Sequence, residues 1–124
     1  MGKQVYGCGL EAALAVIGGK WKFLILYHLV HRPSRFGDLR RQVGGISEKM
    51  LIQELKEMVT DQIVSRRDFH EVPPRVEYSL TAFGKTLAAA LEPLCEWGTL
   101  HRRRIGKSAT QSVPAERAMG RVQN

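Results

Sequence analysis

The sequence predicts a mainly α fold with a small β-hairpin. Apolar residues recur at helical spacing in four segments up to position 60, and again in a long segment after position 81. Two short stretches between them, 63–69 and 75–80, change to the alternation that is typical of strands. Glycine pairs at 18–19 and 44–45 separate the early helical segments. One domain of this length can bury a modest core.

Short turns join the four expected helices. The first should run from about Leu10 to Ile17, and the second from Lys20 to a point before Pro33. A third is expected within residues 34–43, where arginines stand near both ends. Ser47 is the expected N-cap of the fourth helix. The apolar stripe that this fourth helix should bury is Leu51, Leu55, Met58 and Val59.

The expected hairpin and closing helix complete the domain. Residues 70–74, HEVPP, join the two strands, and the adjacent prolines should stiffen the tip because they cannot donate ladder hydrogen bonds. Thr81 should cap a helix over residues 82–105, with Pro93 kinking or breaking it. We expect one domain over residues 1–106, followed by a basic, disordered tail over 107–124.

The total net charge does not by itself indicate a nucleic-acid partner, because the charge is unevenly distributed along the chain. The formal net charge is +7, but residues 101–124 carry six Lys and Arg against one Glu, so much of the basicity lies in the tail. No apolar run approaches the roughly 20 residues of a membrane span, and no secretory segment begins the chain. These observations predict a cytoplasmic protein without a membrane partner.

The order of elements predicts a winged helix-turn-helix. In that architecture the fourth helix enters the DNA major groove, and the hairpin lies along the backbone or the minor groove. The exposed positions at the start of the helix would be Ser47, Lys49 and Gln53, which offer a hydroxyl, a cation and an amide able to read adenine. Arg35 and Arg40 should lie at the phosphate backbone. The simpler alternative is a solvated helix face of mixed charge.

Other function classes find little support in the sequence. GGK at 18–20 and GKS at 106–108 do not complete a phosphate-binding loop, and no nucleophile–base constellation is visible. His28 and His31 share a helix face without a third ligand at metal-binding spacing. We therefore expect no enzyme activity, catalytic residue, metal or cofactor. A winged helix that binds protein instead of DNA remains the alternative.

Three blocks of sequence carry a resemblance to a known family. IGGKWKFLILYHL, RFGDLRRQVGGISEKMLIQEL and EVPPRVEYSLTAFG, followed by Trp97-Gly98, together resemble HxlR-type regulators, which are bacterial transcription factors related to the MarR group. The resemblance implies a homodimer, joined through its terminal helices, on a pseudo-palindromic double-stranded operator. It does not identify a small-molecule effector. The expected DNA-binding residues are Lys20, Arg35, Arg40, Ser47, Lys49, Met50, Gln53, Arg67 and Arg75.

This chain departs from the family pattern at four positions. Ile52 replaces a usual threonine, and Gln62 replaces the glycine of the helix-to-wing turn, where a positive φ is expected. Gly9 follows the first cysteine in place of a frequent proline, and Pro93 interrupts the closing helix. The turn at Gln62 and the geometry of the dimer are the features most exposed to these changes.

The two cysteines are expected to differ in chemistry. Cys8 occupies the place of the cysteine with which several family members sense oxidants or electrophiles. It should lie at the start of the first helix, where free amides and the helix dipole favour a thiolate. Cys95 falls on the apolar stripe of the closing helix, which indicates packing. In a dimer, Cys95 of one chain is a candidate disulfide partner for Cys8 of the other.

Overall fold

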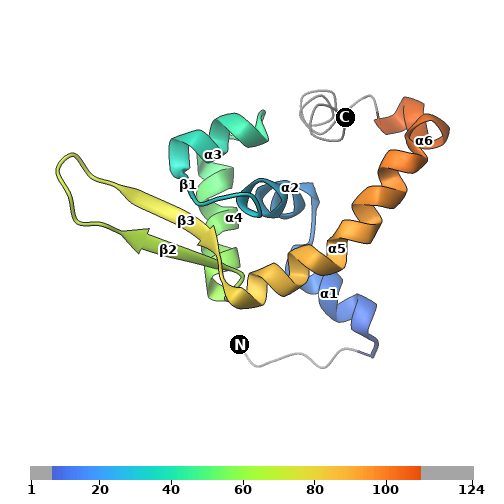
Figure 1. Ribbon diagram of the computed structural model, residues 1–124, viewed down its shortest axis with the longest axis horizontal. Helices are drawn as coiled ribbons and strands as arrows, with labels where there is room; N and C mark the ends of the chain where they lie inside the picture. Colours follow the sequence, from blue (N-terminus) through green and yellow to red (C-terminus); the bar gives the residue numbers. More distant parts are fainter. Residues whose placement is uncertain (1–6, 110–124) are drawn as a thin grey trace.

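The computed structural model describes residues 7–109 and confirms a mainly helical winged helix-turn-helix. The β2–β3 hairpin and the long helix α5 extend from opposite sides of a compact group of helices (Figure 1). In chain order the elements are α1 (Gly9–Ile17), α2 (Lys20–Leu29), β1 (Ser34–Arg35), α3 (Phe36–Val43), α4 (Glu48–Thr60), β2 (Val64–Asp68), β3 (Val76–Leu80), α5 (Ala82–Leu100) and α6 (Arg102–Ala109).

The core lies where α2, α3 and α4 meet the base of the hairpin. Helices α3 and α4 contribute about one buried side chain per turn, as their periodicity predicts, whereas α2 buries three consecutive residues, Leu24–Leu26. Three of the four residues expected on the buried stripe of α4 lie in this core, but Val59 is exposed. Val59 follows Met58 directly, and the rotation of about 100° per residue turns its side chain away from the direction in which Met58 is buried. The buried apolar residues are Leu24, Ile25, Leu26, Leu29, Leu39, Val43, Ile46, Leu51, Leu55, Met58, Ile63, Val64 and Leu80.

The sheet has three antiparallel strands in the order β1–β3–β2, so the two-stranded prediction was incomplete. The additional strand, β1, pairs Ser34 with Tyr78 and Arg35 with Glu77. Arg35 is also the extended N-cap of α3, so this helix begins at Phe36 and not at Ser34. A strand of two residues is too short to show alternation, which explains why the sequence did not predict it.

The turn from α4 to β2 tolerates Gln62 in the left-handed region. Gln62 has φ 63°, as the family pattern predicts for a residue that is usually glycine. The backbone N–H of Gln62 donates to Val59 O at 3.0 Å, and Ile63 N donates to Met58 O at 2.9 Å. This pair of hydrogen bonds is a Schellman motif, which satisfies the last carbonyls of the helix.

The closing helix is continuous through Pro93, which excludes a break, one of the two effects expected of this proline. Thr81 caps α5 as predicted, accepting from Gly84 N at 2.8 Å. Figure 1 shows α5 changing direction along its length, but the interruption falls at His101, between α5 and α6. Helix α6 extends past the predicted domain boundary at residue 106, and residues 110–124 lie outside the described part. Among described residues, no helix combines the length and apolar character needed to cross a membrane.

Candidate nucleic-acid interface

The turn between α3 and α4 forms a polar hollow that opens beside the start of α4. The hollow encloses about 650 Å³ and is lined by residues 37, 40, 41 and 44–47. Gly44 and Gly45 have φ of 73° and 78°, a conformation that favours glycine. The guanidinium of Arg40 crosses the turn, where its Nε donates to Ile46 O at 3.3 Å. Arg40 therefore holds the turn while remaining exposed at its surface.

The first turns of α4 present three of the predicted base-contacting residues. Ser47 is the predicted N-cap, and its Oγ accepts from Met50 N at 3.0 Å, so this hydroxyl already has an intramolecular partner. Lys49 and Gln53 are exposed on the helix surface. Met50 is half-buried and packs against the core. Lys49 and Gln53 are therefore available at this surface, and Ser47 caps the helix while its O–H remains a donor that a phosphate could accept.

An ion cluster fastens α4 to α2 behind this exposed face. Lys22 Nζ lies 3.2 Å from Glu54 Oε1 and also pairs closely with Glu57 Oε1. The Lys22 and Glu54 side chains are only 11% and 14% exposed. Burial lowers the pKa of Lys22, but the two carboxylates outweigh it, so that this pKa is raised. The pKa of Glu57 is lowered by its hydrogen bond with Lys22 and, less strongly, by that with Gln53.

Two further predicted residues lie at the starts of other elements. Arg35 is exposed at the junction of β1 and α3, at the edge of the sheet. It is close in sequence to the first residue that lines the hollow. Lys20 is the first residue of α2, with its ammonium 4.6 Å from the centre of the Trp21 ring. Both cations are accessible, and Lys20 is oriented by a cation–π contact.

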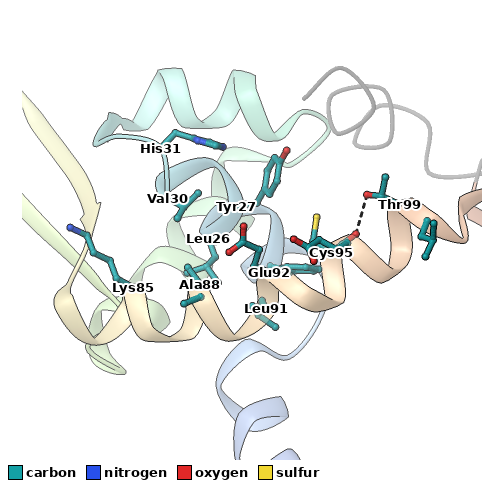
Figure 2. Close-up of a pocket in the computed structure, with 14 residues that line it drawn as sticks. Leu26, Tyr27, Val30, His31, Lys85, Ala88, Leu91, Glu92, Cys95 and Thr99 are labelled. Atoms are coloured by element: carbon teal, nitrogen blue, oxygen red, sulfur yellow. Dashed lines mark hydrogen bonds between the residues drawn. The ribbon is translucent and has the colours of Figure 1, made fainter. Parts of the chain in front are cut away.

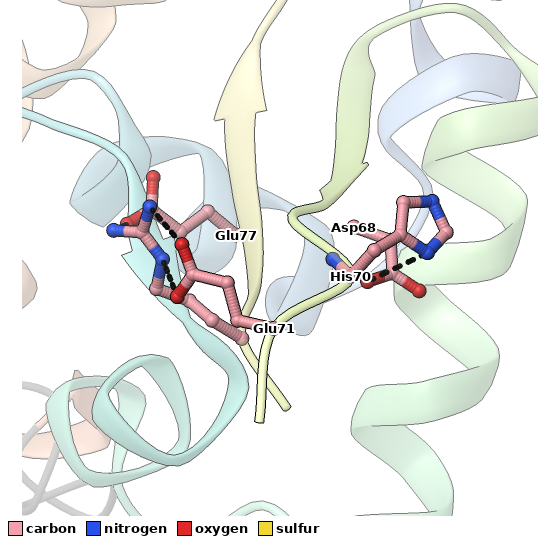
Figure 3. Close-up of polar contacts among 5 residues, drawn as sticks. Asp68, His70, Glu71 and Glu77 are labelled. Carbon is pink, nitrogen blue, oxygen red and sulfur yellow. Dashed lines mark hydrogen bonds and ion pairs between the residues drawn. The ribbon is translucent and has the colours of Figure 1, made fainter. Parts of the chain in front are cut away.

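Two of the three arginines of the wing are stacked on one aromatic ring. The guanidinium carbons of Arg67 and Arg75 lie 4.2 Å and 3.6 Å from the centre of the Phe69 ring. Arg75 also pairs with Glu71 at 3.3 Å and Glu77 at 3.6 Å, and its side chain is 30% exposed (Figure 3). Arg75 therefore organises the wing through these contacts, whereas the exposed Arg67 keeps its guanidinium at the surface.

Aspartate and histidine order the other side of the wing tip. Asp68 Oδ1 accepts from His70 N at 2.8 Å, and it lies 3.7 Å from His70 Nδ1 (Figure 3). His70 has φ 53°, which this Asx-type contact supports. The predicted stiffness of the tip thus has a second source besides the prolines, because ion pairs and a side-chain cap fix both sides of the loop.

A cavity of about 970 Å³ separates α2 from α5, and most of its lining is apolar (Figure 2). Tyr27, His31, Glu92 and Cys95 supply much of its polarity. The Tyr27 hydroxyl is buried and makes no hydrogen bond within residues 7–109. Burial raises the pKa of Tyr27, and the nearby Cys95 raises it further. The rings of His28 and His31 both meet the Tyr27 ring edge-on, with distances of 5.3 Å and 5.7 Å between ring centroids.

The two cysteines lie in the environments that the sequence suggested. Cys8 is exposed and is the N-cap of α1, with its carbonyl accepting from Ala12 N at 3.2 Å. Cys95 is half-buried on α5, at the cavity facing α2. Glu11 places a carboxylate in the first turn of α1, where its Oε1 accepts from Gly7 N at 3.1 Å.

Both terminal helices expose apolar side chains. On α1 these are Leu10 and Leu14, which are 68% and 54% exposed. On α5 four large side chains are at least 55% exposed, namely Phe83, Leu94, Trp97 and Leu100. Exposing this much apolar surface on two helices to water is unfavourable for a monomer, and such surfaces usually mark an interaction site.

Sequence reasoning missed the Lys22–Glu54–Glu57 cluster. Glu54 and Glu57 are spaced to share one side of α4, which was visible in the sequence. Their partner is separated from them by more than thirty positions, so only the packing of α2 against α4 brings Lys22 to them. Within the described part of the chain, no three His, Cys, Asp or Glu side chains gather as metal ligands.

Comparison with known proteins places this architecture in one family. The family model described as HxlR-like helix-turn-helix matches residues 16–105. The chain is 44% identical over 105 residues to the uncharacterized HTH-type transcriptional regulator YtcD of Bacillus subtilis, covering 85% of this chain and 83% of that protein. An uncharacterized HTH-type transcriptional regulator of Methanothermobacter thermautotrophicus is 40% identical over 112 residues, covering 88% and 86%.

A solved structure agrees with the sequence comparisons. The redox regulator HypR in its reduced form is similar, with a TM-score of 0.75 and 43% identity, over 79% of this chain and 97% of that chain. The family model, which matches residues 16–105, includes the helix-turn-helix, the wing and all of α5. This protein belongs to the HxlR-like helix-turn-helix family.

Proposed function

We propose that this protein is a homodimeric transcription regulator that binds double-stranded operator DNA in a sequence-specific manner. The observation that carries the proposal is the exposed start of α4, where Lys49 and Gln53 project from a helix anchored to α2 by buried ion pairs. The regulators named among its relatives support the same reading. Its place of action is the cytoplasm, where bacterial operators lie.

In this proposal α4 enters the major groove and α3 crosses the phosphate backbone. Lys49 and Gln53 meet base edges, and Gln53 is able to bond adenine at two points. Arg40, Arg35 and the hollow between α3 and α4 meet phosphates, which set the register of the protein on DNA. Of the wing arginines, Arg67 reaches the backbone, while Arg75 keeps the wing in shape.

The dimer is formed by α1 and α5 of two chains. The apolar side chains that these helices expose supply the surface, and a second copy is the partner that covers both helices by symmetry. Two α4 helices related by a two-fold axis would then meet half-sites about one helical turn apart.

Oxidation or alkylation of Cys8 regulates DNA binding in this proposal. Cys8 is exposed at the end of α1, within the dimerisation surface, so a change at its sulfur alters how the two chains pack. The similarity to the redox regulator HypR supports this role. Cys95 of the other chain is the candidate partner for a disulfide, which requires Cα atoms within about 7 Å.

A salt titration of binding to an operator obtained by in vitro selection tests the DNA proposal. Arg40→Ala should weaken all sequences alike and reduce the slope of log affinity against log salt by about one unit. Gln53→Ala should instead lower discrimination between sequences by about 1–3 kcal/mol. Arg103→Ala, which removes an exposed cation on α6, is the matched control and should leave both quantities unchanged. Affinity that is absent or insensitive to salt would favour a protein-binding winged helix.

Operator binding before and after mild peroxide or quinone tests the role of Cys8. The wild-type protein should change its affinity, and Cys8→Ser should not. Cys95→Ser separates the disulfide from oxidation of Cys8 alone, with non-reducing gels alongside. Unchanged wild-type affinity with Cys8 demonstrably modified would reject the regulatory role and leave DNA binding untouched.

A further inference from the structure

The Glu57 carboxylate lies between a buried cation and the amide expected to read bases. Its Oε1 pairs with Lys22, while its Oε2 accepts from Gln53 Nε2 at 3.4 Å. Lys22 is in turn held by Glu54, one turn earlier on α4. A continuous series of contacts therefore runs from α2 through Glu57 to the exposed end of Gln53.

The carboxylate selects one of the two orientations of the Gln53 amide. A carboxylate only accepts hydrogen bonds, so it attracts the NH₂ group and repels the amide oxygen. With Nε2 facing Glu57, the amide keeps Oε1 and its second N–H for other partners. Those are the acceptor and donor that a two-point contact with adenine N6 and N7 requires.

We propose that Glu57 is a positioning residue for base recognition: it holds the Gln53 amide in the orientation that reads adenine. This inference rests on the proposed function, because it deepens the role of the same helix. Glu57 does not itself need to touch DNA, since it lies a full turn beyond Gln53. The contact reduces the rotamer freedom that Gln53 would otherwise lose on binding, and glutamine has one of the larger side-chain entropies.

Lys22 makes this arrangement compatible with DNA. An isolated carboxylate beside the groove would repel phosphates, but the Lys22 ammonium partly neutralises it. Lys22 also prevents Glu57 from swinging away from Gln53, because it holds the other carboxylate oxygen. Preference for one base is therefore expected to depend on Glu57 more than overall affinity does.

In vitro selection with wild-type protein and variants measures this preference at each base pair. Gln53→Ala identifies the base pair that Gln53 reads, as the one whose preference is lost. Glu57→Ala should reduce the preference at that same base pair by about three- to tenfold, as expected for releasing one rotamer-rich side chain. Glu57→Gln should lose as much of it, because Lys22 would hold the single side-chain carbonyl and leave the NH₂ group facing Gln53, where it attracts the amide oxygen instead of Nε2. Preferences at other base pairs should change by less than about twofold in either variant.

Two comparisons separate positioning from simple charge or folding effects. Glu48→Ala removes an exposed carboxylate from the same helix and should raise affinity for all sequences without altering preference at the Gln53 base pair. The double variant Gln53→Ala, Glu57→Ala should be no less selective there than Gln53→Ala alone. Full preference in Glu57→Ala, with Gln53→Ala deficient, would overturn this inference alone. A wild-type protein that selects no sequence would overturn the proposed function and this inference together.

Discussion

Gly84→Ala should strongly destabilise the protein, although alanine favours a helix. Gly84 is buried in the first turn of α5, where a Cβ would lie 2.1 Å from Ile63 O and 3.0 Å from Ile63 C. The same carbonyl accepts from Thr81 N at 3.0 Å and from Thr81 Oγ1 at 3.2 Å. The start of α5 is therefore seated directly on the turn that leads into the wing.

The expected magnitude follows from three opposing contributions. Overpacking of the new Cβ against Ile63 costs about 1–3 kcal/mol, because the atoms that it meets belong to the backbone and cannot move aside as a flexible side chain would. Stretching the hydrogen bond from Thr81 N costs about 1 kcal/mol, whereas the Thr81 hydroxyl keeps its shorter bond to Gln62 O at 2.6 Å. The helix propensity of alanine offsets about 1 kcal/mol. The free energy of unfolding should thus fall by about 1–3 kcal/mol, which lowers Tm by about 4–12 °C at this chain length.

Circular dichroism during thermal and urea unfolding provides the measurement, at one fixed protein concentration because a dimer's Tm depends on it. Gly37→Ala is the matched control: Gly37 also lies in the first turn of a helix, but a Cβ there would only touch Arg41 Nη1 at 3.7 Å. The control should be unchanged or slightly more stable. If Gly84→Ala has the same Tm and the same urea midpoint as the wild-type protein or Gly37→Ala, the proposed packing of α5 against Ile63 is wrong.

Three further perturbations test separate parts of the structure. Gln62→Gly should raise the free energy of unfolding by about 1 kcal/mol, because a side chain at φ 63° is strained, and no gain in urea unfolding would argue against that turn. Lys22→Met should destabilise the protein at pH 7 but have less effect near pH 3. The folded pKa of Glu57 lies below its ordinary value of 4.5, so its contribution is present above that pH and is lost as pH falls through the folded pKa. An equal effect of Lys22→Met at both pH values would contradict the ion cluster. Leu94→Glu should yield monomers in sedimentation, since it places a charge on an apolar side chain that is 56% exposed; a persisting dimer would exclude that face of α5.

Local signals were sufficient to predict most of the elements. Ser47 and Thr81 were recognised as helix caps because their hydroxyls accept backbone amides three residues on, which depends only on nearby sequence. The change from helical spacing to alternation located the wing. Pro93 does not break α5, because a proline can be accommodated in a long helix whose neighbouring turns remain bonded, so only the kink among its two expected effects stays compatible with the structure.

Contacts between distant segments were beyond prediction from a single sequence. The pairing of β1 with β3 joins residues more than forty positions apart, and the partner of Glu57 lies in another helix. Arg75 illustrates the consequence for the site. Its position in the wing predicts a DNA contact, which stays a prediction, but the contacts with Phe69, Glu71 and Glu77 within the wing were not predicted. Periodicity reveals which face a residue occupies but not which partners reach it there.

A hydroxyl-radical footprint of the wild-type protein on its selected operator shows how the protein contacts DNA. A dimer that reads DNA through α4 should give two symmetric protected regions about one helical turn apart, with the Gln53-dependent base pair inside each half-site. Lys49→Ala should weaken both regions equally. A single protected region, or protection that is unaffected by changes at Lys49 and Gln53, would contradict a dimer that reads DNA through α4.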